Sequence, residues 1–105
     1  MNIFKSLFKR KQSSNLQNII KEGAFLVDVR TAGEFKEGHV KGSFNIPLDT
    51  IPGQLAKFKN KKNIIVFCRS GMRSGQAKTI LQQHGFTNVV NGGTWLKMNS
   101  MVNNL

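Results

Sequence analysis

The chain has 105 residues, of which 39% are hydrophobic, and this suits one domain with a single core. Its one cysteine excludes an internal disulfide framework and a zinc site built on several cysteines. The net charge of +11 has two explanations, which are an anionic partner and a solvated, lysine-rich surface. Aromatic and basic residues are not interleaved, so we do not expect nucleic acid as the partner.

Residues 1–14, MNIFKSLFKRKQSS, are a basic N-terminal segment, and we assign residues 15–105 to one domain. The segment lacks the long apolar run and the cleavage site of a signal peptide. On a helix the apolar residues of this segment would share one face. The segment is therefore a first helix or a frayed end that packs on the domain, and the alternative is a weak membrane-surface element. No run is apolar for long enough to span a membrane, so there is no firm membrane signal.

Helical and extended patterns alternate along the rest of the chain. Residues 15–23, NLQNIIKEG, carry apolar residues at helical spacing and end in glycine, which predicts a helix. Residues 24–30, AFLVDVR, are a short apolar run typical of a buried strand. Thr31 and Glu34 form a capping-box pattern, which opens a short helix that Gly38 ends.

The alternation continues with a second strand over residues 43–48, SFNIPL. A helix is predicted over residues 51–62, IPGQLAKFKNKK, with Leu55 and Phe58 facing inward. Residues 63–68, NIIVFC, form the most apolar of the predicted strands.

A longer helix is predicted over residues 73–84, and Gly85 is suited to end it. A fourth strand follows over residues 88–91, NVVN, and a short last helix over residues 92–98, GGTWLKM. The inner face of the longer helix consists of Ala77, Ile80, Leu81 and His84.

This alternation predicts an α/β domain with parallel strands and helices on both faces. Ligands bind such sheets at the carboxyl ends of their strands. Two predicted strands end in residues with useful chemistry, one at Asp28 to Arg30 and the other at Cys68. We therefore expect both ends at the same edge of the sheet.

The loop CRSGMRS, residues 68–74, joins a strand to a helix. Gly71 lets the loop curl, so that backbone N–H groups at the helix start converge on the cysteine sulfur as an anion-binding nest. Arg69 and Arg73 add positive charge, so we expect the pKa of Cys68 to lie well below that of a free thiol. A buried inert cysteine, the alternative, would need neither the glycine nor the arginines.

The spacing within this loop separates several chemistries. Four residues lie between Cys68 and Arg73, one fewer than in cysteine-dependent phosphatases, and this tighter ring favours one extra sulfur atom over a phosphoryl group. His39 and His84 lie in contexts that favour structural roles over a catalytic base or a metal ligand. We therefore expect neither a metal nor an organic cofactor.

Two segments, FLVDVRTAGEFKEGHVKGSFNIPL and IIVFCRSGMRSGQAKTILQQHGFTNVVNGG with the following TW, resemble a rhodanese-like single-domain sulfurtransferase. CRSGMRS fits the Cys-x-x-Gly-x-Arg loop of the members that use thiosulfate. The resemblance implies a rhodanese-like three-layer α/β/α domain with a four- to five-stranded parallel sheet. The fifth strand is left open because many members have an extra edge strand where this chain has the basic residues 1–14.

The resemblance also implies a mechanism. Cys68 would attack the outer sulfur of thiosulfate or a similar donor, release sulfite and carry a persulfide, from which cyanide or a thiol takes the sulfur. Arg69 would bind the anionic donor and Arg73 would close the loop. The loop residues expected to bind the donor and the persulfide are Arg69, Ser70, Gly71, Met72 and Arg73.

Other residues have two interpretations each. Asp28 and Arg30 match the turn that, in the family, supports the active loop, which is CRSGMRS in this chain. Glu34 is explained by capping. Trp95 either lines the mouth of the pocket or packs beside the glycine pair. Met72 is either an apolar lip of the pocket or a loop residue that faces solvent.

The same loop also suits a persulfide carrier, which a desulfurase loads and which delivers sulfur to a protein partner in a relay. A non-catalytic rhodanese-fold binding module is a further alternative, although such modules usually lose the cysteine that this chain retains as Cys68. A lone thiol at a reactive position fits a reducing compartment, so a cytoplasmic location is expected.

Overall fold

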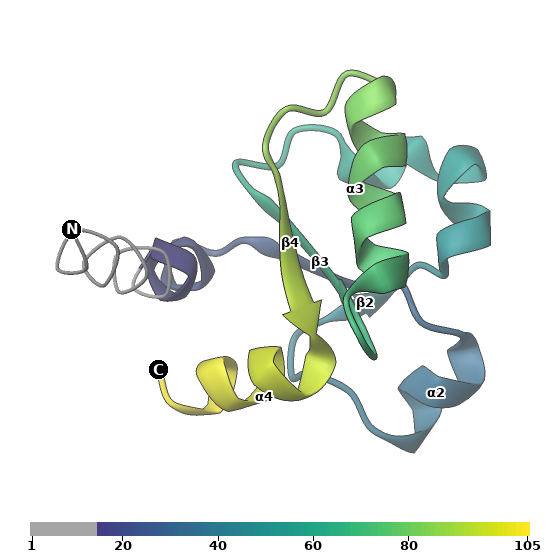
Figure 1. The fold of residues 1–105 in the computed structure, drawn as a ribbon. Helices are drawn as coiled ribbons and strands as arrows, with labels where there is room; N and C mark the ends of the chain where they lie inside the picture. Colours follow the sequence, from purple (N-terminus) through teal and green to yellow (C-terminus); the bar gives the residue numbers. More distant parts are fainter. Residues whose placement is uncertain (1–14) are drawn as a thin grey trace, which may run out of the picture.

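Four parallel strands form the central sheet of the computed structural model, which describes residues 15–105 of the chain (Figure 1). The predicted parallel α/β sheet is confirmed, whereas both interpretations of residues 1–14 lie outside the described residues. The strand predicted over residues 43–48 is much shorter. In their order across the sheet, the strands are β2 (Phe44–Asn45), β1 (Phe25–Asp28), β3 (Ile64–Cys68) and β4 (Val89–Thr94).

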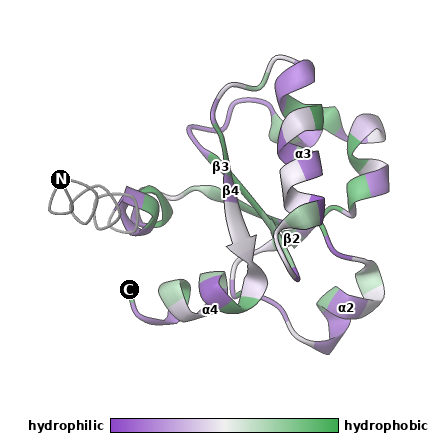
Figure 2. Ribbon diagram, viewed as in Figure 1, coloured by the Kyte–Doolittle hydropathy of each residue, from purple (hydrophilic) through white to green (hydrophobic). Residues whose placement is uncertain are grey.

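β3 lies inside the sheet and is buried along its whole length, because all of its residues, IIVFC, are apolar (Figure 2). Alternate side chains of a strand point to opposite faces. Ile64 and Val66 accordingly join one core cluster, while Ile65 and Phe67 join a second. The burial of each such side chain contributes about 1.5–3 kcal/mol, so this one strand supports a core on both faces of the sheet.

Helices cover both faces of this sheet, which confirms the three-layer arrangement (Figure 1). The longest helix and the two 3₁₀ helices pack on one face, and the last helix packs on the other through the buried Met98. Residues 15–21 are also helical and reach this second face through Leu16. The longest helix is α3 (Met72–Gln83), the two 3₁₀ helices are η1 (Leu48–Gly53) and η2 (Leu55–Phe58), and the last helix is α4 (Trp95–Asn103). The short helix α2 (Ala32–Glu37) follows β1.

The α-helix predicted over residues 51–62 is wrong. Two short 3₁₀ helices, η1 and η2, take its place, and the backbone leaves helical geometry at Gln54, with φ −130°. Pro52 lacks an N–H group and a glycine follows it, so both residues oppose a continuous α-helix. The inward side chains are nevertheless as predicted, since Phe58 is buried in the core and Leu55 packs against it.

α3 ends in a Schellman motif built on the predicted glycine. Gly85 has φ +90°, its N–H donates to the carbonyl of Gln82 at 3.1 Å, and the N–H of Phe86 donates to the carbonyl of Leu81 at 3.0 Å. The inward position predicted for His84 is wrong. This residue is exposed, because the helix ends one residue earlier and His84 serves as its C-cap.

β4 is longer than the strand predicted over residues 88–91, because it continues through the glycine pair that we assigned to the last helix. Its pairing with β3 shifts between Val66 and Phe67, so Gly92 is an extra, bulged residue. The last helix therefore begins at Trp95 rather than at the glycines.

Candidate active site

The cysteine loop turns directly from β3 into α3. Cys68 is the last residue of β3, and its side chain has no exposed surface. Gly71 is the N-cap of α3 and has φ +95°, a left-handed conformation that only glycine adopts without strain. Met72 is the first residue of the helix. The turn is therefore short enough to bring the start of the helix back over the sulfur.

Three groups contact Sγ of Cys68 within hydrogen-bonding distance for sulfur. The N–H of Gly71 donates to it at 3.0 Å, and the N–H of Ser74 donates at 3.4 Å. The hydroxyl of Ser74 lies 3.5 Å away. Ser74 is not among the site residues predicted from the sequence, because the Cys-x-x-Gly-x-Arg pattern ends one residue before it.

The pKa of Cys68 reflects two opposing effects. Burial raises it, but the Ser74 side chain and the backbone N–H groups of Ser74, Gly71 and Ser70 lower it by a larger amount in total. The net result is a pKa below the ordinary value of a thiol. The loop therefore stabilises the thiolate through the Ser74 hydroxyl and its own backbone N–H groups, and this requires no histidine.

Arg73, the second arginine of the loop, forms a two-point ion pair with Glu34 of α2. Its two terminal nitrogens lie 2.7 and 3.0 Å from the carboxylate oxygens. The hydrogen bond from Arg73 is the main reason why the pKa of Glu34 falls from 4.5 to about 2. Glu34 also completes the predicted capping box, in which the N–H of Thr31 donates to it at 3.1 Å. Glu34 thus ties the active loop to α2, a role that local sequence did not reveal.

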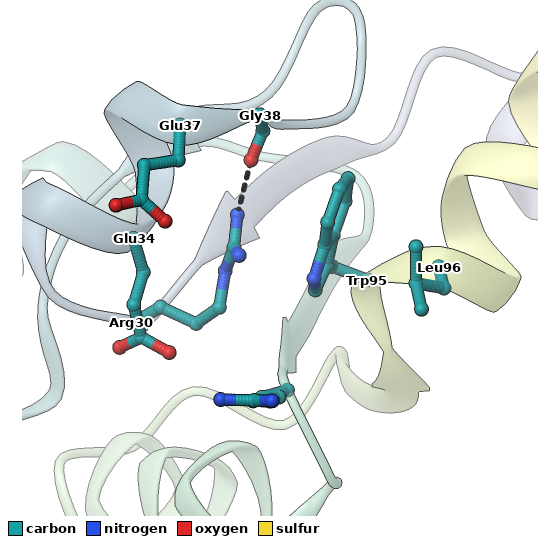
Figure 3. Close-up of a pocket in the computed structure, with 7 residues that line it drawn as sticks. Arg30, Glu34, Glu37, Gly38, Trp95 and Leu96 are labelled. Carbon is teal, nitrogen blue, oxygen red and sulfur yellow. Dashed lines mark hydrogen bonds between the residues drawn. The ribbon is translucent and has the colours of Figure 1, made fainter.

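Asp28 and Arg30 form a buried ion pair beside this loop, at the end of β1. Nε and Nη2 of Arg30 donate to the carboxylate of Asp28 at 3.0 and 2.7 Å. The same guanidinium donates to the carbonyl of Gly38 at 2.7 Å and lies 4.4 Å from the ring centre of Trp95 (Figure 3). These contacts join β1, the end of α2 and the start of α4 into one wall.

A pocket of about 350 Å³ lies against this wall and the active loop. In Figure 3, Arg30 lies between Glu34 on one side and Trp95 on the other. Arg69 is exposed and lines the pocket, whereas the 78% exposed side chain of Met72 does not. The residues that line the pocket are Arg30, Glu34, Glu37, Gly38, Arg69, Trp95 and Leu96.

The two histidines lie outside this pocket. Nδ1 of His39 lies 2.8 Å from the carbonyl of Phe35, and the two rings stack with centres 3.8 Å apart. Within residues 15–105, no group of three or more histidine, cysteine or acidic side chains is placed to hold a metal ion. In the same part of the chain, no helix is long and apolar enough to cross a membrane.

Comparisons with known proteins agree with this geometry. The rhodanese-like domain model matches residues 12–94. Thiosulfate sulfurtransferase PspE of Escherichia coli (strain K12) is 41% identical over 69 residues, which are 64% of this chain and 66% of PspE. Thiosulfate sulfurtransferase GlpE of Pseudomonas savastanoi pv. phaseolicola is 35% identical over 88 residues, which are 82% of this chain and 83% of GlpE.

A solved structure described as rhodanese with anions from E. coli matches with a TM-score of 0.65 and 36% identity, covering 71% of this chain and 91% of that one. These matches give the class of the fold, which is rhodanese-like. The chain belongs to the rhodanese-like domain family, as the resemblance in its sequence predicted. It spans slightly less than two thirds of the length of PspE.

Proposed function

We propose that the protein is a sulfurtransferase that moves a sulfane sulfur from thiosulfate or a similar donor to a thiophilic acceptor through a persulfide on Cys68. The observation that carries this proposal is the contact of Sγ with the N–H groups of Gly71 and Ser74 at the start of α3. Such donors stabilise negative charge on sulfur before and after each transfer. The names of the relatives, which include thiosulfate sulfurtransferases, support the choice of donor.

The first step loads the enzyme. The thiolate of Cys68 attacks the outer sulfur of thiosulfate, a new S–S bond forms, and the old S–S bond breaks with its electron pair on the departing sulfite. The outer sulfur, now part of a persulfide, carries the negative charge. A tight ring of N–H donors holds one sulfur atom well, and this supports sulfur transfer over phosphate hydrolysis.

The second step unloads the enzyme. Cyanide or a thiolate attacks the outer sulfur, and the electron pair of the persulfide bond returns to Sγ of Cys68. The products are thiocyanate or a small persulfide together with the regenerated thiolate. The acceptor comes from outside, so the single cysteine of the chain suffices.

The two loop arginines have different parts in this proposal. Arg73 is committed to Glu34 by its two-point ion pair, so its main effect is to hold the loop closed. Arg69 is exposed, lines the pocket and forms no ion pair within the described residues. It is therefore the group that attracts the doubly charged donor.

Intact-mass measurement after incubation with thiosulfate alone tests the proposal. The protein should gain one sulfur atom, and cyanide should then remove it as thiocyanate. Cys68→Ser should abolish both results and leave the circular dichroism spectrum unchanged. If the wild-type protein gains no mass at any thiosulfate concentration, sulfur transfer from this donor is wrong.

A persulfide carrier in a sulfur relay remains the second candidate, because the loop that holds a persulfide serves both roles. Slow turnover with thiosulfate and fast loading by a desulfurase partner would favour the carrier. A binding module without catalysis is disfavoured, because Cys68 and its N–H donors are all present. The cytoplasmic location stays a prediction.

A further inference from the structure

Asn91 lies next to the active loop because of the bulge in β4. Gly92 is the extra residue in the pairing with β3, and bulges of this kind redirect the neighbouring side chains. The bulge also needs glycine, because a Cβ atom on Gly92 would lie 2.8 Å from Cγ2 of Ile65 and from Sδ of Met98. The result is a carboxamide placed against the start of α3, although sequence analysis gave it no role.

Three hydrogen bonds fix the orientation of the Asn91 side chain. The N–H of Gly93 donates to Oδ1 at 2.9 Å, and Nδ2 donates to the carbonyl of Gly71 at 3.3 Å. A backbone N–H only donates and a carbonyl only accepts, so these two bonds determine which atom of the amide is oxygen. The hydroxyl of Ser74 lies 2.7 Å from that same Oδ1.

The hydroxyl of Ser74 has one proton for three neighbours. Oδ1 of Asn91 at 2.7 Å and the carbonyl of Gly71 at 3.1 Å only accept hydrogen bonds, whereas Sγ of Cys68 at 3.5 Å can donate as a thiol. The shortest contact therefore takes the proton to Asn91. In this orientation an oxygen lone pair faces the sulfur, which suits the thiol, so the Ser74 hydroxyl helps to lower the pKa of Cys68 only when its proton turns from Asn91 toward the thiolate.

We propose that Asn91 is a positioning residue that holds the Ser74 hydroxyl proton away from Cys68 until negative charge develops on the sulfur. The hydroxyl then rotates toward Sγ, and Oδ1 keeps its bond from the N–H of Gly93. Competition of this kind limits how far the thiolate is stabilised. A limit is useful because a strongly stabilised thiolate is also a weaker nucleophile.

The charged groups around the loop are the same with and without Asn91. They comprise the Arg73–Glu34 pair from α3 and α2, the Arg30–Asp28 pair at the end of β1, Glu37 of α2, and Arg69 in the loop itself. β4 contributes no ionisable side chain. A change in the reactivity of Cys68 after Asn91→Ala thus reports the hydrogen-bond network rather than a changed charge.

A double-mutant cycle tests the proposal. The rate of alkylation of Cys68 by iodoacetamide is measured against pH in the wild type, Ser74→Ala, Asn91→Ala and the double variant, without thiosulfate. The experiment rests on the proposed function only for the identity of the reactive thiol, and it gives a result even if sulfur transfer fails. Ser74→Ala should slow alkylation in mildly acidic solution by less than about twofold in the wild-type background, because there a donation to the thiolate breaks the bond from Ser74 to Asn91. In the Asn91→Ala background the slowing should be about fivefold to tenfold, because that competing bond is absent.

Two further variants keep the test decisive. Asn91→Asp retains an acceptor oxygen, so in that background the effect of Ser74→Ala should stay as small as in the wild type. Asn88→Ala is the matched control, because Asn88 also bonds main-chain carbonyls, those of Lys61 and Lys62, but at the other end of β4. If the effect of Ser74→Ala is the same in the wild-type and Asn91→Ala backgrounds, Asn91 does not act through Ser74 and the proposal is overturned.

Discussion

The ion pair between Glu34 and Arg73 predicts how stability depends on pH. Glu34→Gln removes the negative charge and keeps the cap of α2, because glutamine serves equally in a capping box. The pKa of Glu34 falls from 4.5 to about 2 on folding, chiefly through the hydrogen bond from Arg73. At about 1.4 kcal/mol per pKa unit, a shift of this size corresponds to roughly 3 kcal/mol.

Solvent reduces this contribution. The side chains of Arg73 and Glu34 are 33% and 27% exposed, and partly exposed ion pairs are screened by water and salt. We therefore expect Glu34→Gln to lower the free energy of unfolding by about 1–2 kcal/mol at pH 7. Because the folded-state pKa is the lower one, the contribution is complete above the unfolded pKa of 4.5 and is lost as the pH falls through the folded value of about 2.

Urea unfolding of the wild type and of Glu34→Gln between pH 7 and pH 2 measures this difference. The two stabilities should differ most at neutral pH and converge toward the acidic end of the range. Glu37→Gln is the matched control, because Glu37 lies on the same helix and forms no ion pair within the described residues. Equal stabilities at pH 7, or a difference that persists undiminished at pH 2, would refute the reasoning.

Three other substitutions probe the loop and the bulge. Arg69→Ala should raise KM for thiosulfate by about tenfold with little change in stability, and an unchanged KM in steady-state kinetics would place Arg69 away from the donor. Gly71→Ala should lower the free energy of unfolding by about 1 kcal/mol, because a φ of +95° strains any residue other than glycine. The same variant should show slower alkylation of Cys68. Gly92→Ala should cost about 1–3 kcal/mol in urea unfolding through its clash with Ile65, whereas Gly53→Ala, into open space, should cost less.

Local sequence was enough to predict the parts of the fold that depend on neighbouring residues. The apolar run of β3, the capping box at Thr31 and the glycine at position 85 each act within a few residues, and each has its predicted role. The cysteine loop belongs to this group, because the turn and the start of the helix lie within CRSGMRS. The resemblance then gave the family, which the comparisons show.

The contacts that complete the site depend on residues far apart in the chain. Glu34 and Arg73 are 39 positions apart, and Ser74 and Asn91 are 17 apart, so no local period or motif relates them. The sequence placed the glycine pair after Asn91 with the last helix, whereas the pairing with β3 makes Gly92 a bulged residue, close to Ile65. Tertiary packing therefore decided which polar side chains meet at the loop.

The full burial of Cys68 has a steric consequence for the proposed reaction cycle. A sulfur with no exposed surface admits a small donor when the loop opens slightly, but it cannot form a mixed disulfide with a bulky thiol without a larger rearrangement. In the persulfide form that we propose, the terminal sulfur would lie one S–S bond, about 2.05 Å, beyond Sγ. The proposed cycle would therefore shield the empty protein from large electrophiles and oxidants, and the loaded protein would hold its sulfur nearer to an acceptor.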